Sequence, residues 1–276
     1  AEVAISLVVG ALFLILFTWR SLRSEHPVLN FRVFRYPVFA LSTVIGSVIN
    51  MAMFAAMVLL PVYLQNLRGF TPLDAGLLML PGAIVMAVMS PISGWVFDRI
   101  GARALAIVGL IITAVTTWEF SRLTMDTPYS HLIWLYIFRM FGMSMLGMPI
   151  MTEGLNALPR HLYSHGTAMA NTLRQVAASL GTAFLVTVMS NRAKFHVEHY
   201  RNEMTENNPF FMDAVSQLKS VIPSDEAIAQ LLYGVVQQHA TVEGINDAFF
   251  VATGLTVLAL MMAFFLKGKK HKSPSA

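Results

Sequence analysis

The amino-acid sequence predicts an all-α membrane protein with seven transmembrane helices. Of its 276 residues, 56% are hydrophobic and only 12% are charged, about half the roughly 25% charge of a soluble domain. The apolar residues also gather in runs of about 20, the length that a helix needs to cross roughly 30 Å of hydrocarbon. The net charge of +4 is concentrated in short connections and at the C-terminus, which indicates membrane topology rather than nucleic-acid binding.

Seven spans can be drawn, and they divide the chain into six parts. The spans cover residues 3–19, 38–64, 75–97, 104–120, 132–151, 168–189 and 248–266. Pro61 predicts a kink or tilt in the second span, and Thr71-Pro72-Leu73-Asp74 has the capping pattern of a helix start. The expected parts are a first transmembrane helix (1–19), a connection (20–36), five helices (37–192), a loop (193–245), a last transmembrane helix (246–267) and a tail (268–276).

The distribution of Lys and Arg predicts the orientation in the membrane. Seven spans place the two chain ends on opposite sides, and the short connections of one side, together with the tail, contain eleven cations. These are Arg20, Arg23, Arg32, Arg35, Arg99, Arg103, Arg160, Lys267, Lys269, Lys270 and Lys272. The short loops of the other side contain Arg68 and Arg122. Because cationic loops remain in the cytoplasm, we expect 20–36, the turn after residue 97 and the C-terminus to be cytoplasmic and 193–245 to be extracellular.

The long loop contains two apolar patterns at helical spacing. One runs over residues 210–222, and the other runs over 228–236 after a helix start at Ser224-Asp225-Glu226. One interpretation is an amphipathic hairpin that lies on the membrane surface. The other is a lid over an outward-facing cavity.

The residue patterns give little support to an enzymatic function. The sequence contains no phosphate-binding loop, zinc-protease helix, nucleophile elbow or dinucleotide fingerprint. It also lacks cysteine, which excludes a disulfide framework and a thiolate metal site. His161 and His165 are spaced for one helix face, but no third ligand follows nearby. We therefore expect no enzyme activity, no cofactor and no metal site.

Two cations lie inside predicted spans, Arg139 and Arg174. A charge at membrane depth costs at least about 2.5–3.5 kcal/mol on insertion scales, so each one suggests a function. Arg139 is expected to face a cavity or an acidic partner, or to form a structural pair inside the bundle. Arg174, followed by Gln175, could instead extend its side chain to the membrane surface.

Acidic residues are missing from the middle of every span. Glu119 lies near the end of the fourth span and Glu153 just beyond the fifth. Methionines are frequent in the second, third and fifth spans, where flexible thioether side chains suit surfaces that accept several shapes. These methionines are Met51, Met53, Met57, Met79, Met86, Met89, Met140, Met143, Met145, Met148 and Met151.

The most distinctive pattern is the short connection between the third and fourth spans, here called the 94–103 joint. It reads Gly94-x-x-x-Asp98-Arg99-x-Gly101-x-Arg103. Asp98 is expected just before the fourth span, where a helix N-terminus favours an anion. Arg99 and Arg103 could pair with Asp98 or with helix C-terminal carbonyls. Such a charged contact predicts a conformational latch rather than a substrate site.

This joint resembles the signature loop of the major facilitator superfamily, in its second-half copy. Four further matches narrow the resemblance to the fourteen-span drug:proton antiporters, especially the lincomycin-resistance type of exporter. They are His26-Pro27-Val28-Leu29-Asn30-Phe31-Arg32, Leu60-Pro61-Val62-Tyr63-Leu64-Gln65, Ala75-Gly76-Leu77-Leu78-Met79-Leu80-Pro81-Gly82 and the region from Gly154-Leu155-Asn156-Ala157-Leu158-Pro159-Arg160 to Asn171-Thr172-Leu173-Arg174-Gln175. Arg139 with Gly142 and Gly147 is similar to the arginine-glycine motif of the matching first-half helix, though its glycine spacing differs.

The resemblance implies that this chain is the C-terminal half of a proton-coupled exporter in a bacterial plasma membrane. The first span would be a linker helix, and the six later spans would form the C-terminal six-helix bundle of a major facilitator fold. A missing N-terminal half, protons, the lipid bilayer and a small amphipathic substrate would be its partners. In this family two halves rock about a site near the middle of the membrane.

The same resemblance implies roles for particular residues. Gly94, Asp98, Arg99, Gly101 and Arg103 would form the latch. The candidates for the transport pathway are Arg139, Asn50, Asn171, Arg174, Gln175 and Met143, and the candidates for proton coupling are Glu119 and Glu153. Two alternatives stay open: the same fold exporting a lipid, sugar or metabolite, and a non-transporting membrane receptor or scaffold.

Overall fold

The computed structural model describes residues 30–203 and 224–266, together with the isolated residues 9, 10, 12, 13, 15, 16, 18–20, 23, 216 and 218. Among these residues all regular secondary structure is helical. The predicted first span, at 3–19, lies outside the described residues except for scattered positions, which are helical. The pattern over 210–222 and the tail from 267 onward also lie outside the described part of the chain, apart from residues 216 and 218.

Six helical units of the described chain are long and apolar enough to cross a membrane. The α-helices are α2 (Pro37–Val62), α3 (Pro72–Ile100), α4 (Ala102–Glu119), α5 (Tyr129–Ser144), α6 (Gly147–Asn156), α7 (Tyr163–Glu203) and α9 (Asp225–Ala263). Shorter helical turns are η1 (Phe31–Arg35), η2 (Tyr63–Leu67), η3 (Phe120–Arg122) and η4 (Arg160–Leu162). The predicted all-α membrane fold is therefore confirmed for the six later spans.

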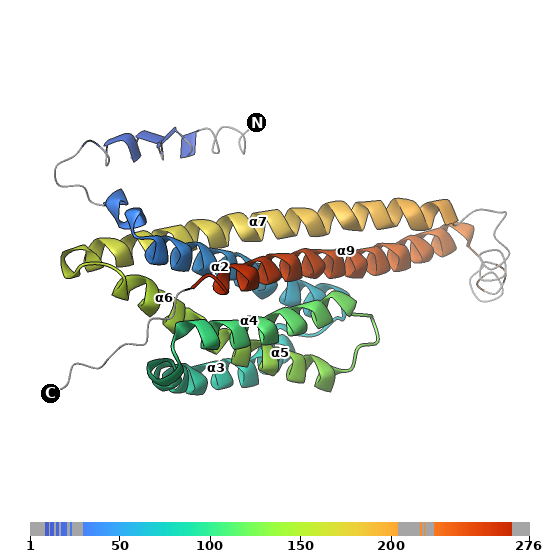
Figure 1. The fold of residues 1–276 in the computed structure, drawn as a ribbon. Coiled ribbons are helices and arrows are strands. Elements are labelled where there is room, and N and C mark those ends of the chain that lie inside the picture. The colour runs from blue at the N-terminus through green and yellow to red at the C-terminus, as the bar shows by residue number, and fades with distance from the viewer. Residues whose placement is uncertain are drawn as a thin grey trace.

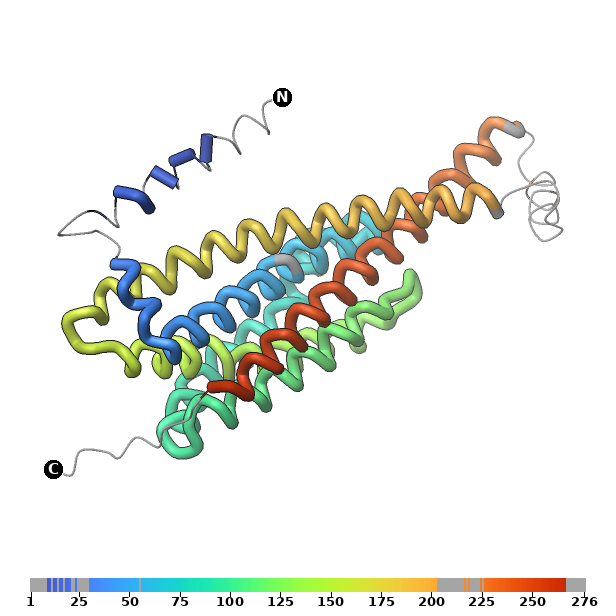
Figure 2. Tube along the Cα trace, turned by 45° about the horizontal axis from the view of Figure 1, so that its top comes forward, coloured from blue at the N-terminus to red at the C-terminus, as the bar shows by residue number. Residues whose placement is uncertain are grey.

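The helices form an elongated bundle with two distinct ends. Helix α7 packs against α2 and α9, α3 packs against α5, and α4 packs against α5 and α9 (Figure 1). The turn at Gly101 lies at one end and the α4–α5 loop around Thr127 at the other, and these are here called the Gly101 end and the Thr127 end. At the Thr127 end α7 and α9 run together beyond the other helices (Figure 2). One cluster of buried residues joins α2 and η2 to α3, η3, α5 and α9, and a second joins α2, α4, α5, α6 and α9.

Two local features agree with the sequence pattern. Thr71 accepts a hydrogen bond from the backbone N–H of Asp74, and the Asp74 carboxylate accepts one from the N–H of Thr71, so α3 begins with a capping box. Pro61 lies inside α2, and η2 follows it as a π-helical turn in which the N–H of Arg68 donates to the carbonyl of Tyr63 over 3.1 Å. Turns of this type inside helices are frequent at functional sites.

The fifth predicted span is two helices rather than one. The N–H groups of Met145 and Leu146 donate to the carbonyls of Gly142 and Met143, three residues earlier, and α5 ends there. Helix α6 begins at Gly147. Two glycines within six residues lower the helix propensity of this segment, which is the sequence feature that accompanies the break.

The described residues of the predicted loop at 193–245 are helical apart from the N-cap residue Ser224. Helix α7 continues to Glu203, and α9 begins at Asp225, which confirms the predicted helix start. Residues 193–203 and 225–245 therefore extend two membrane-length helices, and the second apolar pattern, at 228–236, is part of α9. The physical reason is that the two extensions pack against each other, which an amphipathic pattern alone does not distinguish from packing against lipid.

Candidate functional site

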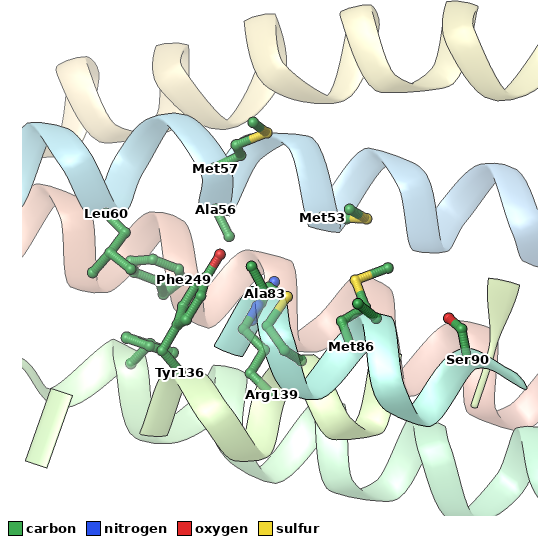
Figure 3. A pocket seen from close by; sticks show the side chains of 13 residues that line it. Met53, Ala56, Met57, Leu60, Ala83, Met86, Ser90, Tyr136, Arg139 and Phe249 are labelled. Carbon is green, nitrogen blue, oxygen red and sulfur yellow. The ribbon is translucent and has the colours of Figure 1, made fainter. Parts of the chain in front are cut away.

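A cavity of about 410 Å³ lies between α2, α3 and α5, with η3 and α9 completing its wall. Figure 3 shows Tyr136 and Arg139 extending from α5 toward α2, beside the α3 side chains. The lining is mostly apolar. Its residues are Met53, Ala56, Met57, Leu60, Ala83, Met86, Ala87, Ser90, Phe120, Tyr136, Arg139, Met140 and Phe249.

The helical spacing of the sequence accounts for two walls of the cavity. On α2 the lining residues lie at positions 53, 56, 57 and 60, and on α3 at positions 83, 86, 87 and 90. Both sets follow the i, i+3, i+4, i+7 pattern of one helix face. Alanines at positions 56, 83 and 87 leave space between the helices, and four methionines supply adaptable side chains around it.

Glycines hold α5 close to its neighbours on either side of the cavity. A Cβ atom on Gly82 of α3 would lie 2.4 Å from the ring of Tyr136. A Cβ on Gly142 of α5 would lie 2.8 Å from the Thr113 hydroxyl and 3.0 Å from the Gly109 carbonyl of α4. Small residues permit this close approach of helices in membranes. The positions of Tyr136 and Arg139 therefore depend on glycines that do not line the cavity themselves.

Arg139 is the most unusual side chain of the cavity, because only 2% of it is exposed and it carries a charge. Its Nη1 donates to the hydroxyl of Thr117, and its Nη2 lies 3.5 Å from the carbonyl oxygen of Ala52. The guanidinium carbon lies 5.9 Å from the ring centre of Phe120. Within the described chain, no carboxylate forms an ion pair with Arg139. A positive charge without a compensating carboxylate therefore faces a largely apolar space.

The other predicted pathway residues do not line this cavity. Asn50 donates to the carbonyl of Gly46 within α2, and Met143 is buried in the core near Leu110 and Leu146. Asn171 and Gln175 are exposed on α7. Arg174 is half-buried: its Nη1 lies 3.2 Å from the sulfur of Met151 and its buried Nε has no hydrogen-bond partner. The structure thus separates Arg139 from the rest of that set.

The two acids considered for proton coupling also lie away from the cavity. Glu119 ends α4 and lies 3.8 Å from a ring nitrogen of His131, with both side chains partly exposed. Glu153 is half-buried on α6. Among the described residues, no group of three or more His, Asp or Glu side chains is arranged to hold a metal ion.

The 94–103 joint differs in detail from the sequence expectation. Helix α3 continues to Ile100, so Asp98 lies in the last turn of α3, and the expectation that it stands at the N-terminus of α4 is wrong. Gly101, with a φ of 83°, separates the two helices and provides the left-handed conformation that a side chain disfavours. Because only one residue separates α3 from α4, Asp98 belongs to α3 rather than to the connection.

The charged residues of the joint face outward. Asp98, Arg99 and Arg103 are exposed, and Asp98 forms no ion pair with any described residue. The Arg99 guanidinium stacks 3.6 Å over the ring of Trp95. No atom of a described neighbour lies within 4 Å of the position that a Cβ on Gly94 would occupy, so the described residues make no close helix contact there.

Several cavity residues were not predicted from the sequence. Tyr136 lies one helical turn before Arg139, and Ser90 continues the α3 face, so the spacing of the third and fifth spans could have indicated both. Phe120 and Phe249 come from segments far apart in the chain, and their rings stack at 5.3 Å between centres. No local pattern indicates that pairing.

Comparisons with known proteins identify the family. Residues 2–182 match the family described as the Major Facilitator Superfamily. The chain is 46% identical over 95% of its length to the uncharacterised MFS-type transporter YhcA of Bacillus subtilis. It is 37% identical over 97% to the lincomycin resistance protein LmrB of the same organism, and 25% identical over 94% to the multidrug export protein EmrB of Escherichia coli.

These matches cover only part of each relative. The aligned regions cover 51%, 50% and 50% of those three relatives, so the chain spans about half the length of the curated relatives it matches. The family match covers more than half of the chain, and it agrees with the six membrane-length helices of the structure. This protein belongs to the major facilitator superfamily.

Proposed function

We propose that this chain is the C-terminal half of a secondary active exporter that moves amphipathic compounds out of a bacterial cell by alternating access. The observation that carries the proposal is the cavity, in which four methionines and three aromatic rings surround the buried cation of Arg139. Its volume of about 410 Å³ falls within the roughly 300–1,000 Å³ typical of small-molecule sites.

The lining supports a site of broad specificity. Met53, Met57, Met86 and Met140 can change rotamer without leaving the cavity, which suits ligands of different shapes. The names of the relatives, a lincomycin resistance protein and a multidrug export protein, point to the same class of cargo. A non-transporting scaffold would favour a bundle without such a space.

Arg139 supplies the polar contact of the proposed site. A buried charge that lacks an opposite charge is costly unless something compensates it. The compensating group is an electronegative group of the cargo or an acid of the N-terminal half, either of which would approach from the open side of the cavity. In the absence of that compensating group, the Thr117 hydroxyl and the Ala52 carbonyl hold the guanidinium in place.

Proton coupling and orientation are part of the proposal. Neither Glu119 nor Glu153 lines the cavity, so we assign the principal proton-carrying acid to the N-terminal half. The Gly101 end faces the cytoplasm, as the positive charges of the connections require, and the extended ends of α7 and α9 face outward. The exposed residues Asp98, Arg99 and Arg103 contact the N-terminal half and set the balance between inward-facing and outward-facing states.

The experiment that tests this function measures efflux by the full-length protein in cells that lack their own exporters. A lincosamide and a lipophilic cation serve as cargo, with and without a pH gradient. We expect efflux that depends on the gradient and that falls in an Arg139→Gln variant but not in an Arg174→Gln variant. Efflux that continues unchanged after the gradient is removed would contradict proton coupling, and no efflux of either compound would contradict the proposed cargo class.

A further inference from the structure

A cluster of titratable side chains joins α7 to α9 outside the cavity. It lies in the part of these helices that extends beyond the Thr127 end, here called the α7–α9 stem (residues 190–203 and 225–247). At its base, a Cβ on Gly244 would lie 2.6 Å from the Met189 carbonyl and 2.8 Å from the Ala193 N–H nitrogen. The two helices are therefore close enough for side chains of one to bond those of the other directly.

His196 of α7 contacts two carboxylates of α9 at the same time. Its Nδ1 lies 2.8 Å from Oε2 of Glu243, and its Nε2 lies 2.8 Å from Oδ2 of Asp247. The His196 side chain is only 16% exposed. A neutral imidazole has one N–H donor, and its other nitrogen carries a lone pair. When both carboxylates are ionised, both contacts are hydrogen bonds only if His196 is a doubly protonated imidazolium, because a neutral ring turns a lone pair toward one of the carboxylates.

The charges around His196 lead to the same conclusion. Arg192 Nε donates to Oδ2 of Asp247 over 2.6 Å, and the Tyr200 hydroxyl donates to Oε1 of Glu243 over 2.5 Å. With neutral His196, the cluster holds one cation and two anions. With protonated His196, two cations balance two anions. Protonation therefore removes a net negative charge from a partly buried contact between helices.

Other titratable and charged groups lie on the stem and on the elements beside it. The ring of His199 lies beside that of Tyr200 on α7, and His239 is exposed one turn before Glu243 on α9. From the neighbouring elements, Arg68 donates to the Thr127 carbonyl and to Tyr63, and Glu119 lies near His131. Asp126 belongs to the α4–α5 loop, where Asn246 of α9 bonds the backbone of Leu123 instead.

We propose that His196, Glu243 and Asp247 form a proton-binding site that locks the α7–α9 stem. Histidine is the side chain whose charge ordinarily changes between about pH 5 and pH 8. Binding of the proton completes both bonds across the two helices, and its loss breaks one of them and leaves two carboxylates beside a neutral ring. The site is distinct from the cavity, and it does not depend on the identity or existence of a transported compound.

The direction of the pH effect follows from linkage. In the packed stem the imidazolium donates to two carboxylates of α9, whereas a separated stem forms neither bond across the helices. The packed state is therefore favoured at low pH, and it loses that advantage as the pH rises and the proton dissociates. Because Asn246 ties α9 to Leu123, separation of the stem is transmitted to the α4–α5 loop beside the bundle.

The test measures the distance between the two helices of the stem in the full-length protein. Spin labels are placed at Asn202→Cys and Gln230→Cys, both exposed positions on α7 and α9. The chain described here has no cysteine of its own, and any cysteine elsewhere in the full-length protein is replaced. We expect a short, narrow distance distribution at pH 5.5. At pH 8.5 we expect the ratio of short to long distances to fall roughly tenfold, the effect of one charge-assisted hydrogen bond.

Matched histidine variants decide the assignment. In His196→Gln, which keeps a polar side chain but binds no proton, the distribution should be the same at both pH values. In His239→Gln, the exposed control, the response should equal that of the parent protein. Asp247→Asn should reduce the change in the distance distribution between the two pH values without abolishing it. This second variant tests the proposal even if His196→Gln fails to fold. A parent distribution independent of pH, or a response that persists in His196→Gln, would overturn the proposal.

Discussion

The 94–103 joint and the Arg139 cavity differ in two ways: how continuous their residues are in the sequence and how deeply their charged side chains are buried. The joint is one continuous stretch with a distinctive pattern, yet its charged side chains point outward and its main contact is a stack of Arg99 on Trp95. The cavity has no continuous pattern and draws residues from α2, α3, η3, α5 and α9. Arg139 at its wall is almost completely buried and bonded to two other helices.

This difference explains why the joint is recognisable in the sequence, whereas the cavity is recognisable only in the packed structure. A motif is recognisable because its residues are adjacent, and the charged residues of this one are exposed, as the proposed contact with an N-terminal half requires. A cavity depends on which helix faces meet, so its residues are recognisable only after the helices are packed. Four substitutions separate the two regions, and they follow in order of decreasing effect.

The largest effect is expected from Asp98→Asn in the full-length protein. Because Asp98 is exposed and forms no ion pair with a described residue, the amount of protein in the membrane and its melting temperature should not change. Energised efflux should fall to background, because the latch would lose its charge. Glu198→Gln, which removes another exposed carboxylate, should leave efflux intact. Normal efflux by Asp98→Asn would remove the joint from the mechanism.

The next effect is expected from Arg139→Ala compared with Arg174→Ala. Arg139 has two hydrogen-bond partners on other helices and faces the cavity, whereas Arg174 is half-buried beside Met151. We expect Arg139→Ala to lower efflux by about tenfold or more, equivalent to about 1.4 kcal/mol in binding. Arg174→Ala should have a much weaker effect. Efflux assays at equal expression measure both, and equal losses would mean that the cavity is not the pathway.

A smaller effect, measured as a loss of stability, is expected from Gly142→Ala. The added methyl group would lie 2.8 Å from the Thr113 hydroxyl and 3.0 Å from the Gly109 carbonyl, and overpacking of this kind costs about 1–3 kcal/mol. Gly147→Ala is the control, because a Cβ there meets nothing within 4 Å. Thermal unfolding in detergent should show a lower melting temperature for Gly142→Ala only. Equal melting temperatures would mean that the α4–α5 contact does not support the cavity.

The smallest effect is expected from Trp95→Leu in the joint. The stack of Arg99 on Trp95 is exposed to solvent, and cation–π contacts at exposed sites contribute only about 0.5–1 kcal/mol. The melting temperature should therefore change less than it does in Gly142→Ala. A loss of stability larger than that of Gly142→Ala would show that the joint is held by contacts inside this chain, and it would reverse the comparison.

The sequence predicted the helices better than the way they end and pack. The capping box of Thr71 and Asp74 and the N-cap at Ser224 were predictable because each depends on residues within one turn. The break between α5 and α6 was missed, although Gly142 and Gly147 lower helix propensity there. The extracellular loop at 193–245 stays a prediction, and its described residues continue α7 and α9, because hydrophobic length limits a membrane span but does not limit a helix.

The candidate site was predictable only in part. Arg139 was identified from the cost of a charge in a span, and the methionines from their frequency. Arg174 was identified in the same way, and Asn50, Asn171, Gln175 and Met143 were named with it as pathway candidates, but none of these five lines the cavity. A polar residue within a span needs either a hydrogen-bonding partner or access to water at the membrane surface. Its polarity does not show toward which helix its side chain points.

The sequence by itself determined the class of the protein, its six later spans, the 94–103 joint and the family. These features depend on composition, on the length of apolar runs and on adjacent residues, all of which are local. Only the tertiary structure decided that Phe120 and Phe249 meet beside Arg139 and that His196 reaches both Glu243 and Asp247. Those contacts join residues from different helices, and they exist only because close packing fixes which helix faces meet.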